Sequence, residues 1–494
     1  MNPLINNPRV RIAPSPTGLL HIGTARSALF NDLFAKKYQG TFVLRIEDTD
    51  VSRSDKKYEK DIIDGLMWLG MIPDEGPIQG GSYGPYRQSE RQAIYTQYLR
   101  ILREQRVIYP CFCSKDELEA DRKTLELVGK PSVYIGRCRD RNASDEEIAS
   151  FIREQGREPI FRFRTPAEKL TFCDLVRGDV AFDAALLGDF AVTRGLQTPL
   201  YNLAVVIDDL TMNITHVIRG EDHISNTPKQ MLLFRAFAKN PPFYAHLPLL
   251  LNTDRTKLSK RRNPVSVNDY QSQGYLPEAV VNFLALLGWN SKTEQEYFTR
   301  EELIRHFDLA GVQKSGAVFS IDRLNWFNAH YLKSRLPAEF LDLSTPYLEK
   351  KARSLEKLSP EQQFRWARIE QERVQKLDEV GEETNFVLQD ALEYDPTLLV
   401  WKKSNLQSAR SSLQAILQWL EARPNEDLGE PETLEVDIKA WILEHSLKAG
   451  DVLWPLRVSL TGKEKSPSPF DALSLLGKRR AISRVQMAIQ CCTE

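Results

Sequence analysis

The first fifty residues constrain the fold more than any other part of the chain. An apolar-leaning run at 9–13 predicts a short buried strand, and the turn-forming cluster Pro-Ser-Pro-Thr-Gly at 14–18 ends it. His21-Ile-Gly-Thr24 follows, and apolar residues then recur at helical spacing through Lys36. A tight loop between a strand and the amino end of a helix presents free N–H groups and a positive dipole to an anion. This stretch therefore predicts a phosphate-binding site in a nucleotide fold.

Two further strings complete the pattern. Arg45-Ile-Glu-Asp-Thr-Asp50 ends a second expected strand in acidic residues, and Lys257-Leu-Ser-Lys-Arg261 places a cluster of cations far downstream. Together with residues 11–18 (Arg-Ile-Ala-Pro-Ser-Pro-Thr-Gly) and 21–24, they closely resemble the bacterial-type glutamyl-tRNA synthetases. In that resemblance, residues 21–24 stand as the HIGH motif of class I synthetases and residues 257–261 as the KMSKS motif. Thr24 departs from HIGH, and bacterial glutamyl enzymes tolerate this departure.

The resemblance covers essentially the whole chain of 494 residues, which is too long for a single core. It implies a multidomain protein: an α/β nucleotide-binding, Rossmann-like catalytic domain with an α+β insertion, followed by all-α anticodon-binding domains. The expected segments are the first half of the catalytic fold (1–107), an inserted acceptor-stem-binding domain (108–197), the second catalytic half (198–248), a KMSKS-loop and stem-contact helical domain (249–335), and a helical anticodon-binding region (336–494, divided near 385).

Local patterns predict several individual features. Residues 360–377 and 408–420 have the apolar spacing of amphipathic helices. Residues 454–462 are interpreted as a strand-like exception within this helical region. Ser89 is expected to cap a helix, and Cys173 is expected to be a small core residue.

Charge and hydropathy limit the choice of partners and location. The net charge is −1, so an RNA-binding role requires a basic face that is segregated from an acidic one. The clusters at 255–262 and 478–480 permit such a face, although a run of charges is usually a solvated surface. No stretch approaches the roughly eighteen apolar residues of a membrane span, and no basic-then-apolar leader precedes the first strand. We therefore expect a cytoplasmic monomer without a membrane segment.

Three of the six cysteines are grouped as Cys111-Phe-Cys113 and Cys138. In a cytosolic chain, closely spaced cysteines indicate a metal rather than a disulfide. Three thiolates need a fourth ligand, and the two candidates are Tyr134 and Asp140, at the second of which some bacterial relatives carry a histidine. The alternative is that these are spare buried thiols. A zinc ion held here would be structural and remote from the chemistry.

The resemblance implies amino-acid activation, in which a carboxylate attacks the α-phosphorus of ATP and pyrophosphate leaves. The carboxylate is already ionised at neutral pH, so the reaction needs no general base. Catalysis then consists mostly of alignment and of stabilising charge on the phosphoryl oxygens, with Mg²⁺ carried by the ATP phosphates and water. The expected catalytic residues are His21, Lys257 and Lys260.

Glutamate brings two carboxylates and one ammonium group to its site. Arginine suits carboxylates because its fork is bidentate and always charged. The resemblance places the glutamate site at Arg11, Ala13, Ser15, Glu47, Tyr201 and Arg219, with Glu47 taking the α-ammonium. It places the ATP site at Pro14, Thr17, Gly18, His21, Gly23, Thr24, Asp222, Leu258, Ser259, Lys260 and Arg261. Taken singly, Arg11, Arg219 and Glu47 fit a surface charge or a helix cap equally well.

The expected function is ligation of L-glutamate to tRNA(Glu) in two steps. ATP-dependent formation of glutamyl-AMP precedes transfer to the 3′-terminal ribose of the tRNA, and members of the family generally need tRNA present for the first step. The alternative is a non-discriminating variant that also glutamylates tRNA(Gln). An aminoacylation assay with transcripts of both tRNAs distinguishes the two.

Rival interpretations fail on length or on motif. A stand-alone nucleotidyltransferase or a glutamyl-queuosine-type paralogue would be much shorter. Glutaminyl-tRNA synthetases and archaeal-type glutamyl enzymes end in β-barrels, whereas the carboxyl third lacks evenly spaced alternating strands. A non-enzymatic RNA-binding relative would be expected to have lost His21 or Lys260, and both are present.

Overall fold

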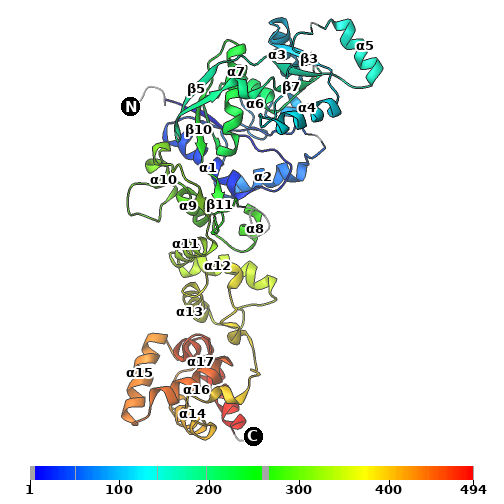
Figure 1. The fold of residues 1–494 in the computed structure, drawn as a ribbon. Helices are drawn as coiled ribbons and strands as arrows, with labels where there is room; N and C mark the ends of the chain where they lie inside the picture. The colour runs from blue at the N-terminus through cyan, green and yellow to red at the C-terminus, as the bar shows by residue number, and fades with distance from the viewer. Residues whose placement is uncertain (1–5, 51, 142, 196, 259–265, 493–494) are drawn as a thin grey trace. The chain divides into compact units, whose positions relative to one another are not determined.

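The computed structural model describes residues 6–50, 52–141, 143–195, 197–258 and 266–492 (Figure 1). The chain divides into two compact units, one formed by Met1–Gln271 with Val280–Ile321 and the other by Ser272–Ala279 with Asp322–Glu494. The second unit has its own apolar core, because the buried cluster around Trp366 lies wholly within it. Among the helices in the described ranges, none is long and apolar enough to cross a membrane.

The predicted strand–loop–helix–strand stretch opens the first unit. β1 (Arg9–Ile12) pairs in parallel with β2 (Thr41–Leu44), and α1 (Ile22–Lys37) connects them, as a parallel pair requires. β2 ends at Leu44, so the acidic residues at 45–50 follow the strand rather than continue it.

A larger sheet stands next to this pair. β9 (His216–Gly220) lies beside β1, where the N–H of Thr215 donates to the carbonyl of Arg9 at 2.9 Å. The strand order continues as β6-β5-β10-β9, with β10 (Phe243–Leu247) parallel to both β9 and β5 (Lys169–Asp174) and with β6 (Gly178–Asp183) antiparallel to β5. Two helices that pack on each other, α6 (Tyr201–Thr211) and α7 (Thr227–Ala236), accompany the sheet.

A second four-stranded sheet is antiparallel throughout and forms the α+β part of the first unit. Two of its helices begin with complete capping boxes, at Ser114 and Ser144, so their first N–H groups are satisfied locally. The strands are β3 (Ile108–Cys111), β4 (Ile160–Phe163), β7 (Ala191–Arg194) and β8 (Thr198–Pro199), and the helices are α3 (Gln92–Glu104), α4 (Lys115–Leu127) and α5 (Asp145–Gln155).

Short elements complete the first unit and lead toward the second. A two-residue pair of parallel strands, β11 with β12, follows the large sheet. The remaining elements are α2 (Lys56–Trp68), β11 (Leu250–Leu251), α8 (Val267–Ser272), α9 (Pro277–Leu286), α10 (Arg300–His306) and β12 (Ala317–Val318). α11 (Ile321–Lys333) belongs to the second unit except for its first residue.

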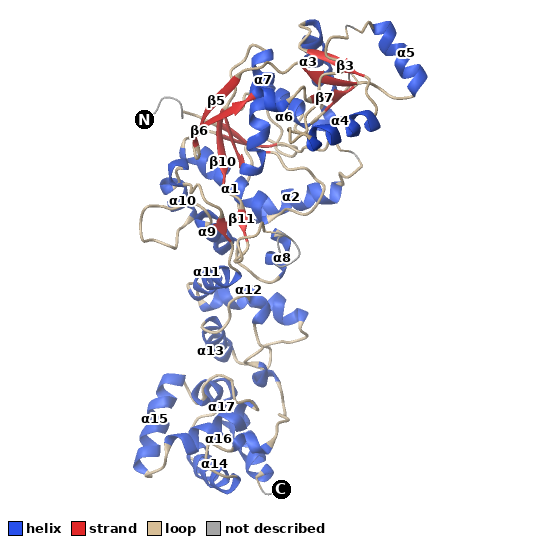
Figure 2. Ribbon diagram, viewed as in Figure 1, coloured by secondary structure: helices blue, strands red, loops and turns tan. Residues whose placement is uncertain are grey.

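Within the described part of the second unit, all regular elements are helical (Figure 2). α12 packs on α13, and α14, α16 and α17 pack on one another around Leu413, Leu456 and Leu473. α17 is kinked at Gly477, whose φ of 70° favours glycine. These helices are α12 (Pro337–Lys350), α13 (Pro360–Gln371), α14 (Leu406–Glu421), α15 (Pro431–Glu444), α16 (Ala449–Thr461) and α17 (Pro469–Cys491).

The strand-like interpretation of 454–462 is wrong, because α16 spans this segment. Val452, Leu456 and Leu460 recur at every fourth position and are fully or almost fully buried, which is a helical pattern that begins before the segment. Pro455 lies inside this helix, although proline is rare in helix interiors. The other misplaced boundary is that of α13, which ends at Gln371 and not near 377.

Two single-residue expectations are also wrong. Cys173 is exposed, because β5 alternates and this side chain points to the face opposite the buried Leu170 and Asp174. Ser89 does not cap α3, which begins after Arg91. Its hydroxyl instead donates to Asp48 at 2.5 Å and its N–H donates to the same carboxylate at 2.8 Å, which ties the entry of α3 to the segment after β2.

Candidate active site

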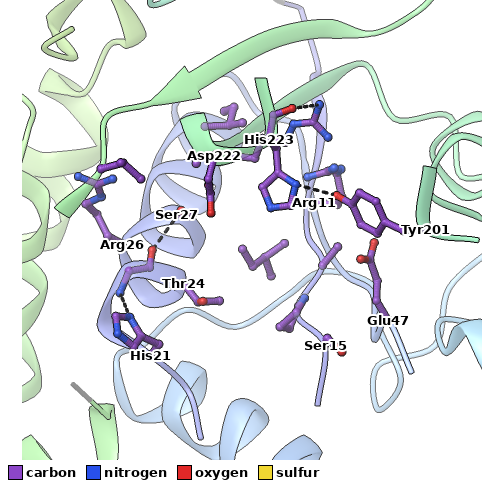
Figure 3. A pocket seen from close by; sticks show the side chains of 18 of the residues that line it. Arg11, Ser15, His21, Thr24, Arg26, Ser27, Glu47, Tyr201, Asp222 and His223 are labelled. Atoms are coloured by element: carbon purple, nitrogen blue, oxygen red, sulfur yellow. Dashed lines mark hydrogen bonds between the residues drawn. The ribbon is translucent and has the colours of Figure 1, made fainter. Parts of the chain in front are cut away.

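A cavity of about 700 Å³ lies in the first unit at the ends of several strands (Figure 3). Its lining follows the carboxyl ends of β1, β2, β9 and β10 and includes the first turn of α1. Open α/β sheets bind their ligands at this edge. In Figure 3, His21 and Thr24 lie on one side of the space, and Glu47 and Tyr201 lie on the opposite side.

The cavity brings together most of the residues that the sequence assigned to ATP and glutamate. Thr17 and Gly18 do not line it, and the side chain of Thr17 is exposed in the turn that precedes α1. Ser259, Lys260 and Arg261 lie outside the described residues, so their placement stays a prediction. The predicted residues that line the cavity are Arg11, Ala13, Pro14, Ser15, His21, Gly23, Thr24, Glu47, Tyr201, Arg219, Asp222, Lys257 and Leu258.

His21 is the N-cap of α1, and its role there determines which ring nitrogen carries the proton. Its Nδ1 accepts the backbone N–H of Gly23 at 3.0 Å. An accepting Nδ1 has no proton, so in the neutral ring the proton is on Nε2. His21 therefore caps α1 through Nδ1 and, in the neutral ring, has its proton on Nε2.

Arg26, which the sequence analysis missed, also lines the cavity, from the second turn of α1. Its guanidinium donates to the carbonyl of Leu287 at 3.2 Å and to that of Pro248, so it links α1 to the ends of α9 and β10. Burial lowers the pKa of Arg26 to about 10, an effect that the charge of Glu221 opposes. No pattern in the sequence of α1 separates Arg26 from its polar neighbours Ser27, Asn31 and Asp32.

A buried network of charges lies beneath the cavity. Arg45 is fully buried, and its guanidinium donates to Asp209 at 2.6 Å and to Glu47 at 3.0 Å, and lies 3.6 Å from Asp208. Burial raises the pKa of Glu47, although Arg45 and Arg11 act in the opposite direction. The pKa of this carboxyl, which borders the cavity, thus depends on two opposing effects: burial favours the neutral form, and the two arginines favour the ionised form.

Two more arginines balance this network. Arg11 donates to Asp209 at 3.2 Å, and Arg91 donates to Asp208 at 2.6 Å. Asp208 also accepts from Gln88 at 2.8 Å. The three arginines 11, 45 and 91 thus face the three carboxylates 47, 208 and 209, and such pairing is the usual condition for burying charge.

Arg219 reaches the cavity from the end of β9 and is held from behind. Its Nη2 donates to the hydroxyl of Thr227 at 2.8 Å, and its Nε lies 3.3 Å from Nε2 of His246. Nη1 has no hydrogen-bond partner among the described residues. Burial lowers the pKa of Arg219. An anchored guanidinium with an unpaired nitrogen beside a cavity is suited to a ligand carboxylate.

Tyr201 and His223 form a polar pair on the same wall. The hydroxyl of Tyr201 lies 3.0 Å from Nδ1 of His223, as the dashed line in Figure 3 indicates. Burial, together with the charge of Arg219, lowers the pKa of His223 to about 4, so the ring is neutral at pH 7. The sequence analysis missed His223, although it stands in the same Gly-Glu-Asp-His string as Asp222.

Lys257 is the one described lysine among the expected catalytic residues. Its Nζ lies 3.9 Å from Asp222, and its side chain is largely exposed at the mouth of the cavity. The backbone around it is ordered by Asn252, whose amide donates to the carbonyl of Lys257 at 3.2 Å.

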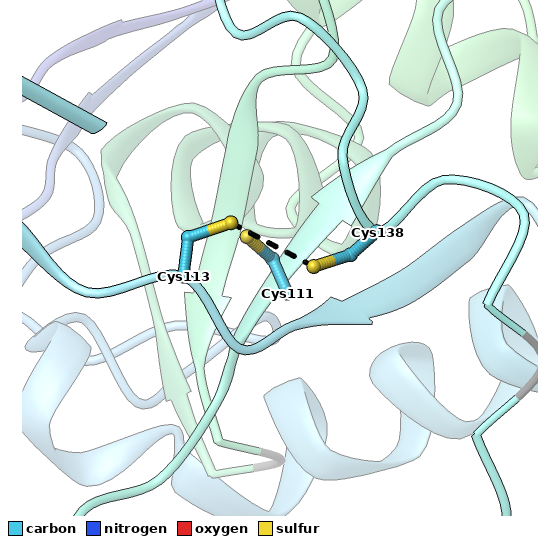
Figure 4. Close-up of side chains that lie close together, drawn as sticks. All are labelled: Cys111, Cys113 and Cys138. Atoms are coloured by element: carbon cyan, nitrogen blue, oxygen red, sulfur yellow. Dashed lines mark hydrogen bonds between the residues drawn. The ribbon is translucent and has the colours of Figure 1, made fainter. Parts of the chain in front are cut away.

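The three grouped cysteines meet in the α+β part (Figure 4). Their sulfur atoms lie within 4.8 Å of one another, and the hydroxyl of Tyr134 is 3.5 Å from Cys111 Sγ and 3.8 Å from Cys113 Sγ. Asp140 is exposed and is not part of this cluster. The three cysteine sulfurs are placed to hold a metal ion, and the Tyr134 hydroxyl is the neighbouring oxygen.

The basic run at 478–480 is only partly available to a ligand. Lys478 Nζ donates to the carbonyl of Glu421 at 2.9 Å, and Arg480 donates to that of Val387 at 2.7 Å. Arg479 is the exposed member of the three.

Known proteins resemble this chain along nearly its whole length. The family model described as "tRNA synthetases class I (E and Q), catalytic domain" matches residues 8–326, and the "Anticodon binding domain" model matches residues 339–489. The glutamate–tRNA ligase of Carboxydothermus hydrogenoformans is 42% identical over 97% of this chain and 98% of its own length. The glutamate–tRNA ligase of Symbiobacterium thermophilum is 41% identical over 97% of this chain and 98% of its own length. A crystal structure of a glutamate tRNA ligase from Elizabethkingia meningosepticum is 32% identical, with a TM-score of 0.87 over 98% of this chain and 99% of that one.

Proposed function

Because this chain belongs to the glutamate–tRNA ligases, a group of class I aminoacyl-tRNA synthetases, we propose that the cavity at the ends of β1, β2 and β9 binds its ATP and its glutamate. The enzyme attaches glutamate to tRNA, and it uses ATP together with Mg²⁺. One observation carries the proposal. Groups suited to phosphate, such as His21, and groups suited to a dipolar acid, such as Arg219 and Glu47, line the same cavity.

In the first step, an oxygen of the glutamate α-carboxylate attacks the α-phosphorus, the bond to the β,γ-diphosphate breaks, and pyrophosphate leaves with the electron pair. The residues of the chain move no proton in this step, because the nucleophile is already an anion. Nε2–H of His21 would donate to a phosphate oxygen, and the charge of Lys257 would stabilise the departing pyrophosphate. Lys260 has the same proposed role from the segment outside the described residues.

The amino acid would lie on the opposite wall. Arg11 and Arg219 would face its two carboxylates, and Glu47 would accept from its α-ammonium. Burial raises the pKa of Glu47, and the charges of Arg45 and Arg11 act against this effect and favour the carboxylate form. Tyr201 and the neutral His223 add uncharged polar contacts. In the second step the 2′-hydroxyl oxygen of the terminal ribose attacks the glutamyl carbonyl, the bond from that carbonyl to the AMP oxygen breaks, and AMP leaves with the electron pair and takes up the hydroxyl proton.

Arg219 gives the direct test of this assignment. The substitution Arg219→Gln should raise the KM for glutamate about tenfold or more, with the KM for ATP little changed. The loss of a charged partner for a carboxylate costs about 1.5–3 kcal/mol. Steady-state aminoacylation with each substrate varied in turn measures the two constants. The exposed Arg122→Met variant serves as the control, and equal damage to both substrates would identify Arg219 as structural.

We also propose that Cys111, Cys113, Cys138 and Tyr134 hold one structural zinc ion. The clustering of the sulfurs supports this proposal, and the 2.8 Å hydrogen bond from the Cys138 N–H to the Tyr134 hydroxyl keeps that oxygen beside them. The ion would join β3 to the loop before α5 and would take no part in catalysis.

Elemental analysis after dialysis against a chelator should find one zinc per chain. Tyr134→Phe should loosen the metal, whereas Asp140→Ala should leave it bound, because only the former removes an oxygen from the cluster. Metal-free protein from zinc-supplemented cells would contradict the site. Loss of zinc from the Asp140 variant alone would transfer the fourth position to that residue.

The partners follow from the reaction. The enzyme acts on tRNA, glutamate and ATP, and we propose tRNA(Glu) as its RNA substrate. We further propose a monomer that works in the cytoplasm, where aminoacylated tRNA is consumed. The five segments expected from the sequence, with their boundaries at 107, 197, 248 and 335, remain the proposed division into domains.

A further inference from the structure

A line of buried polar groups extends away from the cavity behind Arg219. Asp174 ends β5, His246 lies on β10, and Arg219 lies on β9, so the three residues occupy three adjacent strands of one sheet. Their exposed fractions are 1%, 0% and 6%. Of the three, only Arg219 lines the cavity.

The contacts in this line are short and continuous. Asp174 Oδ2 lies 2.6 Å from His246 Nδ1, and His246 Nε2 lies 3.3 Å from Arg219 Nε. Thr227 joins the far end, since its hydroxyl is 3.1 Å from the same Nε2 and accepts from Arg219 Nη2 at 2.8 Å. Asp174 thus fixes the ring of His246, and His246 in turn contacts the guanidinium of Arg219.

The proton positions follow from chemistry. Backbone N–H groups of Val176 and Arg177 donate to Asp174 Oδ1 at 3.0 and 2.8 Å, and these bonds stabilise a carboxylate. An ionised Asp174 can only accept, so Nδ1 of His246 must carry a proton. Burial lowers the pKa of His246, so the ring is neutral and its Nε2 has a lone pair. That lone pair can accept from Arg219 Nε at 3.3 Å and from the Thr227 hydroxyl at 3.1 Å.

We propose that Asp174 is a positioning residue for glutamate binding, which acts through His246 to orient the guanidinium of Arg219. With Nε and Nη2 held in this way, Nη1 is the nitrogen left for the substrate. This inference rests on the proposed role of Arg219 as a glutamate ligand. If Asp174 were purely structural, it would only join β5 to β10, and its loss would affect the KM values for glutamate and for ATP alike.

Asp174→Asn is the informative substitution. The amide oxygen can keep the two backbone hydrogen bonds, but the NH₂ group must donate to His246 Nδ1 and drives the ring proton to Nε2. The N–H of His246 Nε2 and the N–H of Arg219 Nε, two donors, then face each other. The KM for glutamate should rise about tenfold, which corresponds to one lost hydrogen bond to a charged group, while the KM for ATP stays near its original value.

A second variant acts on the other side of the ring. His246→Asn should keep a partner for Asp174 but lacks the reach to Arg219, so the same defect confined to glutamate is expected. In the double variant Arg219→Gln/Asp174→Asn, the second change should add nothing to the first, because Asp174 acts only through Arg219. Asp32→Asn is the matched control, since Asp32 is also buried and paired with an arginine but does not line the cavity.

These variants distinguish the role of Arg219 as a glutamate ligand from the positioning role of Asp174. If Arg219→Gln leaves glutamate binding unchanged, the proposed role of Arg219 falls. If Arg219→Gln impairs glutamate binding but Asp174→Asn and His246→Asn do not, only the positioning role falls. If Asp174→Asn and His246→Asn raise the KM for glutamate and the KM for ATP equally, or if both variants fail to fold, these residues have a structural role and the inference is overturned.

Discussion

Replacing Arg45 by methionine is expected to lower the free energy of unfolding by about 3–5 kcal/mol. Arg45 is fully buried and pairs with Asp209 and Glu47 at 2.6 and 3.0 Å. Without it, three buried carboxylates face two arginines, and one negative charge lacks compensation. Chemical denaturation followed by circular dichroism measures the change.

The loss should depend on pH in a defined direction. Burial raises the pKa of Glu47, and removing the positive charge of Arg45 raises it further. A carboxyl whose pKa is higher in the folded state costs stability above its unfolded pKa, and the cost disappears as the pH falls. The difference between variant and parent should therefore shrink from pH 8 to pH 5. Arg122→Met, at an exposed ion pair, should change stability little at either pH, and a pH-independent loss would contradict the charge argument.

Replacing His21 by asparagine is expected to slow glutamyl-AMP formation by about 10²–10³-fold, the usual effect of removing one donor to a charged transition state. Asparagine is a strong N-cap, so it can replace the 3.0 Å hydrogen bond that His21 makes to the N–H of Gly23. It cannot reach the position of Nε2. ATP–pyrophosphate exchange in the presence of tRNA measures the first step.

The same substitution carries its own control for folding. Because the cap is retained in His21→Asn, its melting temperature should stay close to that of the parent. His21→Ala loses the cap as well, so it should slow the reaction and also lower the free energy of unfolding by about 0.5–2 kcal/mol. An asparagine variant with normal exchange activity would show that His21 only caps α1. An equal fall in stability for both variants would show that the cap had not been replaced.

The sequence predicted the site better than it predicted the polar contacts that support it. Residues of the strand–loop–helix string at 9–36, such as His21, line the same cavity as Glu47, which follows β2, and Arg219, which lies near the end of β9. These positions could be predicted because strand ends and helix starts have local signals. Arg26 and Asp174 have no such signal, since their partners lie on segments distant in the sequence, whereas His223 stands in the same string as Asp222.

The errors have the same physical origin. Residues 454–462 alternate over a short window, but the core packing shared with α14 and α17 favours the helical spacing of Val452 and Leu456. Cys173 was expected in the core from its residue type, whereas the register of β5 turns it to the outside. In both cases the tertiary environment overrode a local preference.

The charge network has a consequence for the order of events during synthesis. Arg45 and its partner Asp209 are 164 residues apart, and β1 lies beside β9, which begins at His216. At a ribosomal rate of about 5–20 residues per second, the nascent chain carries its amino-terminal arginines for roughly 8–33 s before the second aspartate is made. During that time Arg11 and Arg45, joined later by Arg91, lack the two aspartates that pair with them in the folded protein. Because β9 follows the α+β part in the sequence, β1 cannot gain this neighbour until the whole α+β part has been synthesised.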